Sequence, residues 1–268
     1  LNLAAIYAPN RRGKVSPNTQ EVYDLKGTKY NEYWGWQDGE KRNSRVKRVV
    51  EPIVILNHDW IIDENSSLET SIGFQFGEMG NSRLGYAGGS NPSPAYYQDL
   101  PSYFLADSDG PDYQGAYIAQ ENFVNDGQIN WNRIYDANIT NNLANINAAY
   151  VLYEDRVDDS QITFNSAYLK EINDNIKIST SVNYRNLISD NFAEITDMLG
   201  GSGYSNIDSF DFLDYNLLVP NSIASEGDKF RYHYKMNVDE LSAFAMVDFS
   251  FNKLEFFLAG NVTNTNYQ

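Results

Sequence analysis

The sequence predicts an all-β protein: an antiparallel transmembrane β-barrel segment of about seven strands, with long extracellular loops. Three observations lead to this prediction. Apolar and polar residues alternate along several stretches, such as "SLETSIGFQF" at residues 67–76. These stretches come in pairs joined by short polar turns, and long polar segments separate the pairs. Tight turns on one side and long loops on the other are typical of outer-membrane barrels.

The expected strands follow from this alternation, which has the period of a β-strand. The first is "LNLAAIYA" at residues 1–8, and the other six form three pairs, at 50–62 and 67–77, at 161–171 and 176–186, and at 241–251 and 254–265. Their turns are "DENS", "NDN" and "NK". The expected extracellular loops are 9–48, 78–158 and 187–238.

The two faces of the expected strands differ in chemistry. Apolar residues of 67–76 fall on one parity, and the other parity of the strands carries mainly Ser, Asn, Gln, Gly and Thr. A solvated sandwich face would usually carry many Lys and Glu, so this composition favours a lumen filled by water or a plug. Sandwiches share the alternation itself. A secreted or surface β-sandwich that binds carbohydrate or calcium therefore stays open as the alternative.

The composition excludes several function classes. The formal net charge of -16 argues against nucleic acid, whose phosphates need a basic surface. The lack of cysteine excludes disulfides, thiol catalysis and Cys-ligated zinc. No apolar run approaches the roughly 20 residues of a spanning helix. The mean hydropathy of -0.51 does not decide the class, because barrel strands hide apolar residues at alternate positions.

Catalysis has little support in the sequence. The two histidines are His58, within an expected strand, and His233, where a loop meets a strand. No Ser/His/Asp group, phosphate loop or paired metal motif can be built from histidines so placed. Nothing selects two of the 36 acidic residues as a glycosidase pair. We expect no catalytic residue and no enzyme activity.

Aromatic residues of the expected loops are candidate ligand contacts. Their rings would form a stacking platform for a sugar or a peptide, or would pack the loops against their neighbours or the membrane interface. Both interpretations stay open. The candidates are Trp34, Trp36, Tyr96, Tyr97, Tyr103, Phe104 and Trp131.

Two charged strings are further candidate sites. A basic string lies before an expected strand, where it would meet lipopolysaccharide phosphates or instead be solvated or paired in the lumen. Its members are Lys41, Arg42, Arg45, Lys47 and Arg48. The string "DSDGPD" offers oxygen ligands for Ca²⁺, although the EF-hand pattern is incomplete and acidic turns are common in surface loops. Those ligands would be Asp107, Asp109 and Asp112, and no other cofactor is expected.

Several longer strings resemble the TonB-dependent receptors of Bacteroidetes, in the same order, between about Leu3 and Asn261. The strings are "NEYWGWQDGEKRNSRVKR" (31–48), "SIGFQFGEMGNS" (71–82), "NPSPAYYQDLPSYF" (91–104), "QINWNRIYDAN" (128–138), "MLGG" with the acidic, aromatic run after it (198–215), and "EGDKFRYHYKM" (226–236). Each string is weakly specific, but together they are fairly specific.

The resemblance implies an energised outer-membrane importer, a roughly 22-stranded barrel closed by an N-terminal plug domain. Implied partners are outer-membrane lipid and lipopolysaccharide, the plug domain, TonB and a surface lipoprotein. The sequence lacks a plug, a TonB box and a signal peptide, and about seven strands cannot close such a barrel. We therefore expect an internal stretch of a longer polypeptide. Fold does not fix the ligand, which stays open among iron chelates, vitamins, glycans and peptides.

Overall fold

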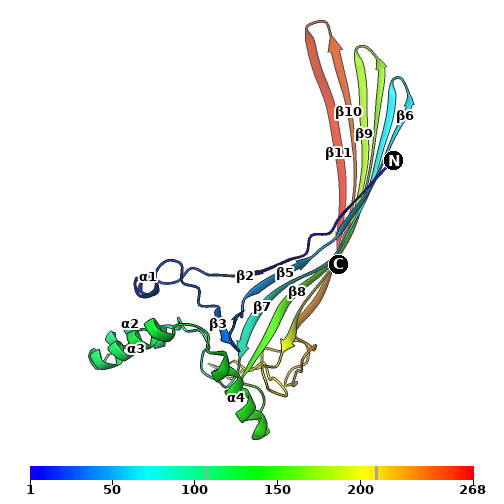
Figure 1. The fold of residues 1–268 in the computed structure, drawn as a ribbon. Helices are drawn as coiled ribbons and strands as arrows, with labels where there is room; N and C mark the ends of the chain where they lie inside the picture. The colour runs from blue at the N-terminus through cyan, green and yellow to red at the C-terminus, as the bar shows by residue number, and fades with distance from the viewer. Residues whose placement is uncertain (107, 209–210) are drawn as a thin grey trace.

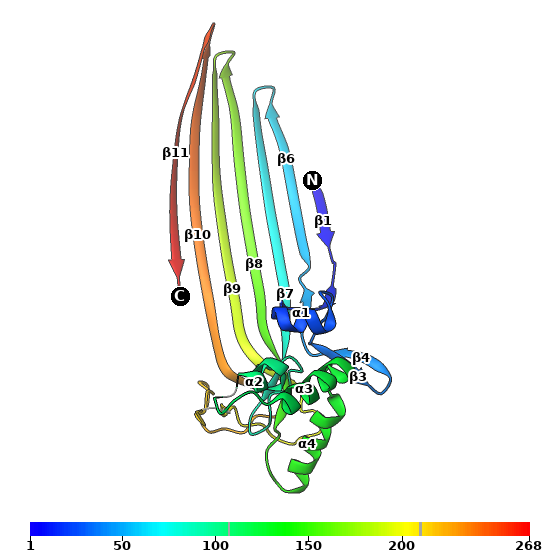
Figure 2. The same cartoon turned by 90° about the vertical axis from the view of Figure 1, so that its left-hand side faces the viewer.

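A long, curved antiparallel sheet carries a layer of helices and loops at one end (Figures 1 and 2). The computed structural model describes residues 1–268 except 107 and 209–210. The hairpin turns that follow Asp63, Asn173 and Phe251 lie at the end opposite the helices. The prediction of a mainly antiparallel β protein is confirmed.

Seven strands form the main path of the sheet, and each is antiparallel to its neighbours. In spatial order they are β1 (Asn2–Ile6), β6 (Ile53–Asp63), β7 (Ser66–Tyr86), β8 (Tyr150–Asn173), β9 (Ile176–Asp197), β10 (Lys229–Phe251) and β11 (Leu254–Tyr267). The sheet is open, and β1 and β11 are the edges of this path within the described residues.

Four strands are longer than the alternation predicts. The strand expected at 67–77 continues as β7 to Tyr86, and β9 continues past 186 to Asp197. At the other end, β8 and β10 begin at Tyr150 and Lys229 instead of 161 and 241. The residues beyond the predicted strand ends are still paired with the neighbouring strands. On both faces of the sheet, however, their side chains are charged or buried. A pattern that requires one apolar and one polar face therefore misses them.

The expected loop 9–48 contains regular structure. It holds β2 (Asn10–Gly13), α1 (Gln20–Lys26), the hairpin of β3 (Trp34–Gln37) and β4 (Glu40–Asn43), and the start of β5 (Val46–Val50). β5 pairs with β2 on one side and with β7 on the other. β5 and β6 follow one line along β7, interrupted at Pro52, which has no N–H for the ladder.

The expected loop 78–158 contains the remaining helices. They are the 3₁₀ helix η1 (Tyr97–Asp99), α2 (Pro101–Leu105), α3 (Tyr113–Asp126) and α4 (Trp131–Leu143). The side chains of Asp112 and Asn130 cap α3 and α4 by accepting from backbone N–H groups. No helix in the described part of the chain has the length and apolar character to cross a membrane.

The buried core sits at the helix-bearing end, on both faces of the extended strands. Tyr150 and Leu152 of β8 pack with Trp131 of α4 on one face. Val151 and Tyr153 pack on the other face, in a cluster that includes residues of the β9 to β10 connection. Alternate residues of one strand therefore join two different clusters, which holds the helix layer and this connection on opposite sides of the sheet.

Asn138 of α4 ties these parts together. It is fully buried, and its Nδ2 donates to the carbonyl oxygens of Tyr150, Met198 and Leu199 at 2.8, 3.0 and 3.1 Å. Its Oδ1 accepts from the backbone N–H groups of Ala149 and Tyr150 at 2.9 and 3.0 Å. One side chain thus pairs backbone groups of the start of β8 and of the chain just after β9.

Replacing Asn138 with Leu should lower the free energy of unfolding by about 3 kcal/mol or more, because several buried backbone groups would lose their partners. The measurement is the urea unfolding midpoint in detergent micelles. Asn142→Leu, at an exposed position of the same helix, is the matched control and should change stability by less than about 0.5 kcal/mol. Equal losses in both variants would contradict this role.

Candidate functional site

One face of the sheet carries rows of mainly apolar side chains, which Asn186, Asn237 and Asp239 interrupt on β9 and β10. The strand register places residues directly opposite one another on the same face. One such row crosses all seven strands of the main path and consists of Leu3, Leu56, Ile72, Phe164, Tyr184, Leu241 and Asn264. We call the face that contains this row, between the hairpin turns and Phe76 of β7, the apolar face.

The apolar face is uncovered by the described residues. Ile72, Phe74 and Phe76 are 42, 41 and 41% exposed, although they lie in the middle of a wide sheet. The rings of Phe74 and Phe76 are stacked, with their centres 5.0 Å apart. His58 lies on this face beside Leu56 and is also exposed. An uncovered apolar surface of this kind marks contact with a partner or a membrane.

The opposite face of the same strands is mainly polar, and we call it the polar face. Ser71 donates to Asn57 at 2.8 Å, and Arg185 donates to Gln161 at 2.9 Å. Asn183 continues such contacts by donating to Ser242 at 3.3 Å. These side chains satisfy one another across neighbouring strands, so this face tolerates both water and polar partners.

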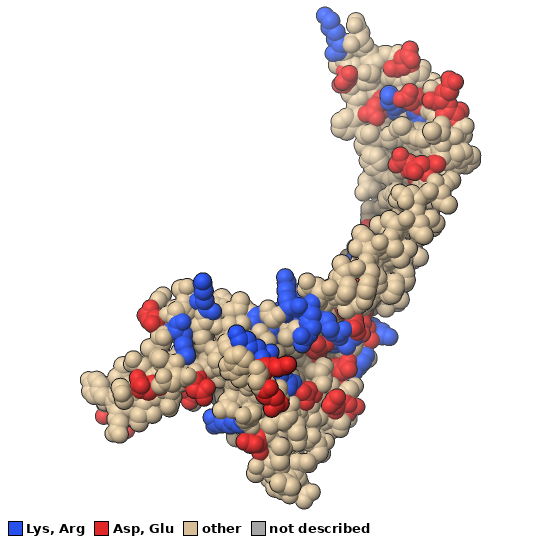
Figure 3. Space-filling model, viewed as in Figure 1, with Lys and Arg blue, Asp and Glu red and all other residues tan. Residues whose placement is uncertain are grey.

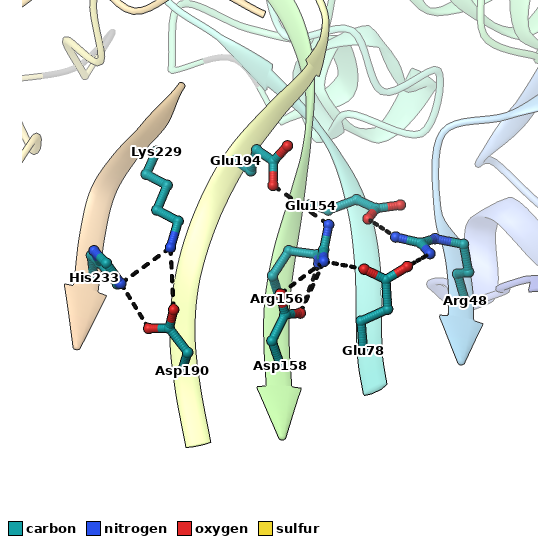
Figure 4. A network of polar contacts seen from close by, with 9 residues as sticks. All are labelled: Arg48, Glu78, Glu154, Arg156, Asp158, Asp190, Glu194, Lys229 and His233. Atoms are coloured by element: carbon teal, nitrogen blue, oxygen red, sulfur yellow. Dashed lines mark hydrogen bonds and ion pairs between the residues drawn. The ribbon is translucent and has the colours of Figure 1, made fainter. Parts of the chain in front are cut away.

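Beyond Phe76, the apolar face ends in a network of charged residues (Figure 4). Arg156 contacts Glu78 and lies 2.9 Å from Asp158 and 3.4 Å from Glu194. Arg48 bonds the same Glu78 from the neighbouring strand. This hydrogen bond holds the pKa of the Glu78 carboxyl below its usual value and raises the pKa of Arg48. The network links β5, β7, β8 and β9 where the apolar rows stop.

His233 belongs to a neighbouring charged cluster in Figure 4. Its Nε2 lies 2.7 Å from Asp190, and Lys229 Nζ lies 3.2 Å from the same carboxylate. Burial works to raise the pKa of Asp190, but hydrogen bonds from His233 and Lys229 hold that pKa below its usual value. Lys229 also lies 3.7 Å from the centre of the Phe192 ring.

The structure brings four of the predicted aromatic residues together. Ring centres are 4.9 Å apart for Tyr96 and Tyr97, 5.8 Å for Tyr97 and Tyr103, and 5.7 Å for Tyr103 and Phe104. This aromatic cluster surrounds η1 and α2. Phe104 also lines a cavity of about 510 Å³ between the 90–94 segment, α3 and α4.

The predicted tryptophans lie elsewhere. Trp34 and Trp36 sit on β3 with ring centres 5.7 Å apart, and Lys41 Nζ is 4.5 and 5.4 Å from the two rings. Trp36 is 57% exposed and remains accessible. Trp131 is fully buried, and its Nε1 donates to the backbone oxygen of Arg42. Trp131 therefore packs in the core, where it is inaccessible from the surface.

The basic string is divided by strand alternation. Lys41 covers the tryptophans of β3, and Arg42 pairs with Asp197 at 2.6 Å while lying 4.5 Å from the Trp131 ring. Arg48 belongs to the network of Figure 4. Lys47 of β5 lies opposite Asn81 on the polar face, and Arg45 directly precedes β5. The five cations therefore do not form one phosphate-binding patch.

Of the predicted calcium ligands, Asp109 and Asp112 lie within the described residues. Asp112 accepts the N–H of Gly115 at 2.9 Å as the cap of α3. Asp107 lies outside the described residues. Within the described part of the chain, no group of three or more acidic or histidine side chains could hold a metal ion.

Sequence reasoning missed the charges that the strand pairing brings together. Glu78, Arg156 and Glu194 come from three distant segments, and no local motif marks them. Arg12 and Lys14 do belong to a visible basic string, "RRGK" at 11–14. Only the pairing of β2 with β5 shows that this string lies beside "RVKR" at 45–48.

Glu78→Gln should weaken the dependence of stability on acid pH. Because the folded protein holds the pKa of Glu78 below 4.5, its contribution is present above that value and is lost as the pH falls through the folded pKa. The contribution should be on the order of 1 kcal/mol after solvent screening. Urea midpoints between about pH 7 and pH 3 measure it. Glu69→Gln, on the polar face near the turn, is the control, and equal effects of both changes would contradict this assignment.

Comparisons of the chain with family models, curated proteins and solved structures returned no significant match. The functional interpretation therefore depends on the surfaces described above.

Proposed function

We propose that this chain forms part of the barrel wall of an outer-membrane TonB-dependent receptor, which captures an extracellular ligand and imports it through a plugged barrel. The observation that carries this proposal is the apolar face, whose central row is apolar from Leu3 of β1 to Leu241 of β10 and has no covering layer among the described residues. Lipid is a solvent that suits such a face when its opposite face is polar. The receptor class comes from the strings between 31 and 236 that resemble that family.

The dimensions of the apolar face support this assignment. The segment of β7 from Ser66 to Phe76 has 11 residues. At about 3.3 Å per residue and a tilt of about 45°, it spans about 25 Å along the membrane normal, which matches the apolar band of outer-membrane barrels. The charged residues around Arg156 begin where this span ends. In this proposal they lie at the outer membrane surface.

The two ends of the sheet fit the two sides of an outer membrane. The hairpin turns between β6 and β7, β8 and β9, and β10 and β11 would face the periplasm, and the helix layer would lie outside the cell (Figure 2). Unpaired strand edges cost several kcal/mol for each exposed backbone group in lipid. The proposal therefore requires further strands beside β1 and β11, from the same polypeptide or another chain.

Ligand contact belongs, in this proposal, to the aromatic cluster and to Trp34 and Trp36. The exposed rings of Tyr97, Tyr103 and Trp36 are the accessible members of these groups. The plug domain, TonB and a surface lipoprotein are proposed partners by family resemblance. No catalytic residue is proposed.

Spin labels at successive positions of β7 test the membrane assignment directly. The chain has no cysteine, so single-cysteine variants from Ser71 to Phe76 can be labelled one at a time. In full-length protein reconstituted into lipid, even positions should be accessible to oxygen dissolved in the bilayer and odd positions to a water-soluble relaxing agent. A sandwich core would protect the even positions from both reagents. That result would reject the barrel.

A charge on each face should have unequal effects. Ile72→Arg should lower the free energy of unfolding from lipid by about 2–4 kcal/mol, because it places a cation in the middle of the apolar band. Ser71→Arg is the matched control on the adjacent residue and should cost about 1 kcal/mol, mainly through the lost hydrogen bond to Asn57. Unfolding by guanidinium in lipid vesicles measures both. Similar costs at the two positions would contradict the proposed orientation.

A further inference from the structure

Five cations lie in two neighbouring rows on the polar face, at the paired ends of β2 and β5 and beside β7. Arg12 lies directly opposite Lys47 in the ladder of β2 and β5. In the next row the backbone N–H of Lys14 bonds the carbonyl oxygen of Arg45 at 2.7 Å. Arg83 lies on β7 two residues beyond Asn81, which pairs with Lys47, so it shares the face of these cations. We call these five residues the cation rows. Figure 3 shows Lys and Arg side chains gathered over this part of the molecule.

Side-chain contacts place the cation rows on one face. Lys47 lies opposite Asn81, and Lys14 Nζ donates to the Oδ1 of that asparagine at 2.6 Å. Asn81 has the parity of Ser71 and Gln75 on the same strand, so the cations lie on the polar face. Arg12, Lys14 and Arg83 are exposed, and Arg45 and Lys47 are half-buried. The rows are therefore open to solvent.

Carboxylates do not balance these charges. Asp155 pairs with Arg83 and also accepts from the Tyr232 hydroxyl at 2.9 Å. Among the described residues, the other four cations form no ion pair. Arg45 instead lies 5.0 Å from the ring centre of Tyr33. This is unusual in a chain with 36 acidic and 20 basic residues, where a cation normally has many acidic neighbours available.

The arrangement is unfavourable without a bound anion. Like charges directly opposite one another destabilise a strand pair. Burial, and then the charges of Arg83, Lys47, Arg45 and Arg12, lower the pKa of Lys14. The backbone positions of neighbouring cations are about 5 Å apart across the strands and about 7 Å apart along them. One anion with several charged groups could therefore contact several of these cations and relieve their repulsion.

We propose that the cation rows bind a soluble anion that carries several phosphate or carboxylate groups. The guanidinium groups of Arg12 and Arg45 would each offer a planar pair of donors that matches such groups. The choice of a soluble anion over a lipid headgroup rests on the proposed function, because the cation rows then face away from lipid, on the side opposite Ile72. The positive charge of the cation rows is the reason for proposing an anion as the ligand.

Titration with inositol hexakisphosphate and with citrate tests this proposal. The full-length protein in neutral detergent should bind both probes, and the logarithm of the affinity should fall linearly with the logarithm of salt concentration. Arg45→Ala with Lys47→Ala should weaken binding by about tenfold or more. Lys177→Ala, which removes a cation paired with Glu171 near a hairpin turn, is the control and should bind like the parent protein.

Stability measurements show whether the double variant remains folded. Without anion it should be at least as stable as the parent, because like-charge repulsion is removed, and inositol hexakisphosphate should stabilise the parent more. No binding by the parent, or an equal loss in the Lys177 control, would overturn the proposal. Binding only to phosphatidylcholine vesicles that contain phosphatidylglycerol would also overturn it, in favour of a lipid headgroup. Failure of the spin-label alternation with intact anion binding would reject the barrel and retain the anion site.

Discussion

The continuous antiparallel register of β6 to β11 is the constraint on which the other features depend. Successive side chains of a strand point to opposite faces, so a shift of one residue in any pair would move apolar side chains into the polar rows. The register keeps Ile72 opposite Leu56 and Phe164, and it keeps Ser71 opposite Asn57 and Asn165. The hairpin turns and the lateral hydrogen bonds of the polar face hold the same register. One apolar and one polar surface result.

Alternation predicts the strands only where the two faces have different surroundings. It identifies the part of each strand near the hairpin turns, because Leu68 to Phe76 have an uncovered apolar row and a polar row. The alternation fails beyond Phe76 for two reasons. Val151 and Leu152 are both buried, each in a different hydrophobic cluster on its own side of the sheet. Glu78, on the same face as Phe76, is charged and paired with Arg48. The helices within 78–158 were missed for another reason. Their sequences are rich in Asn, Asp and Tyr, and tertiary contacts such as those of Asn138 stabilise them more than intrinsic propensity does.

The candidate site shows the same division between local and long-range information. The run from Tyr96 to Phe104 could be predicted as an aromatic group because its members are close in sequence, and the structure keeps their rings in contact. The basic string at 41–48 suggests one patch from sequence alone, but the structure separates its members. Because successive residues of a strand point to opposite faces, Arg48 lies on the face of Ile72 and Lys47 lies on the polar face. Arg42 packs against the Trp131 ring. Its real neighbours, such as Arg12 and Glu78, come from other strands.

The two faces also explain why charge is distributed so unevenly in an acidic chain. On the face of Ile72, many of the charges beyond the apolar rows are paired: Arg48 and Arg156 share Glu78, and Lys229 and His233 share Asp190. Paired charges suit a boundary between apolar side chains and water, where an isolated charge would be costly. On the opposite face, Arg12, Lys14, Arg45 and Lys47 have no such partners among the described residues, and the face is already polar. An unbalanced cluster can persist there because water screens it. The same exposure leaves it free to exchange water for an anionic ligand, which links the arrangement of charge to the anion site proposed for the cation rows.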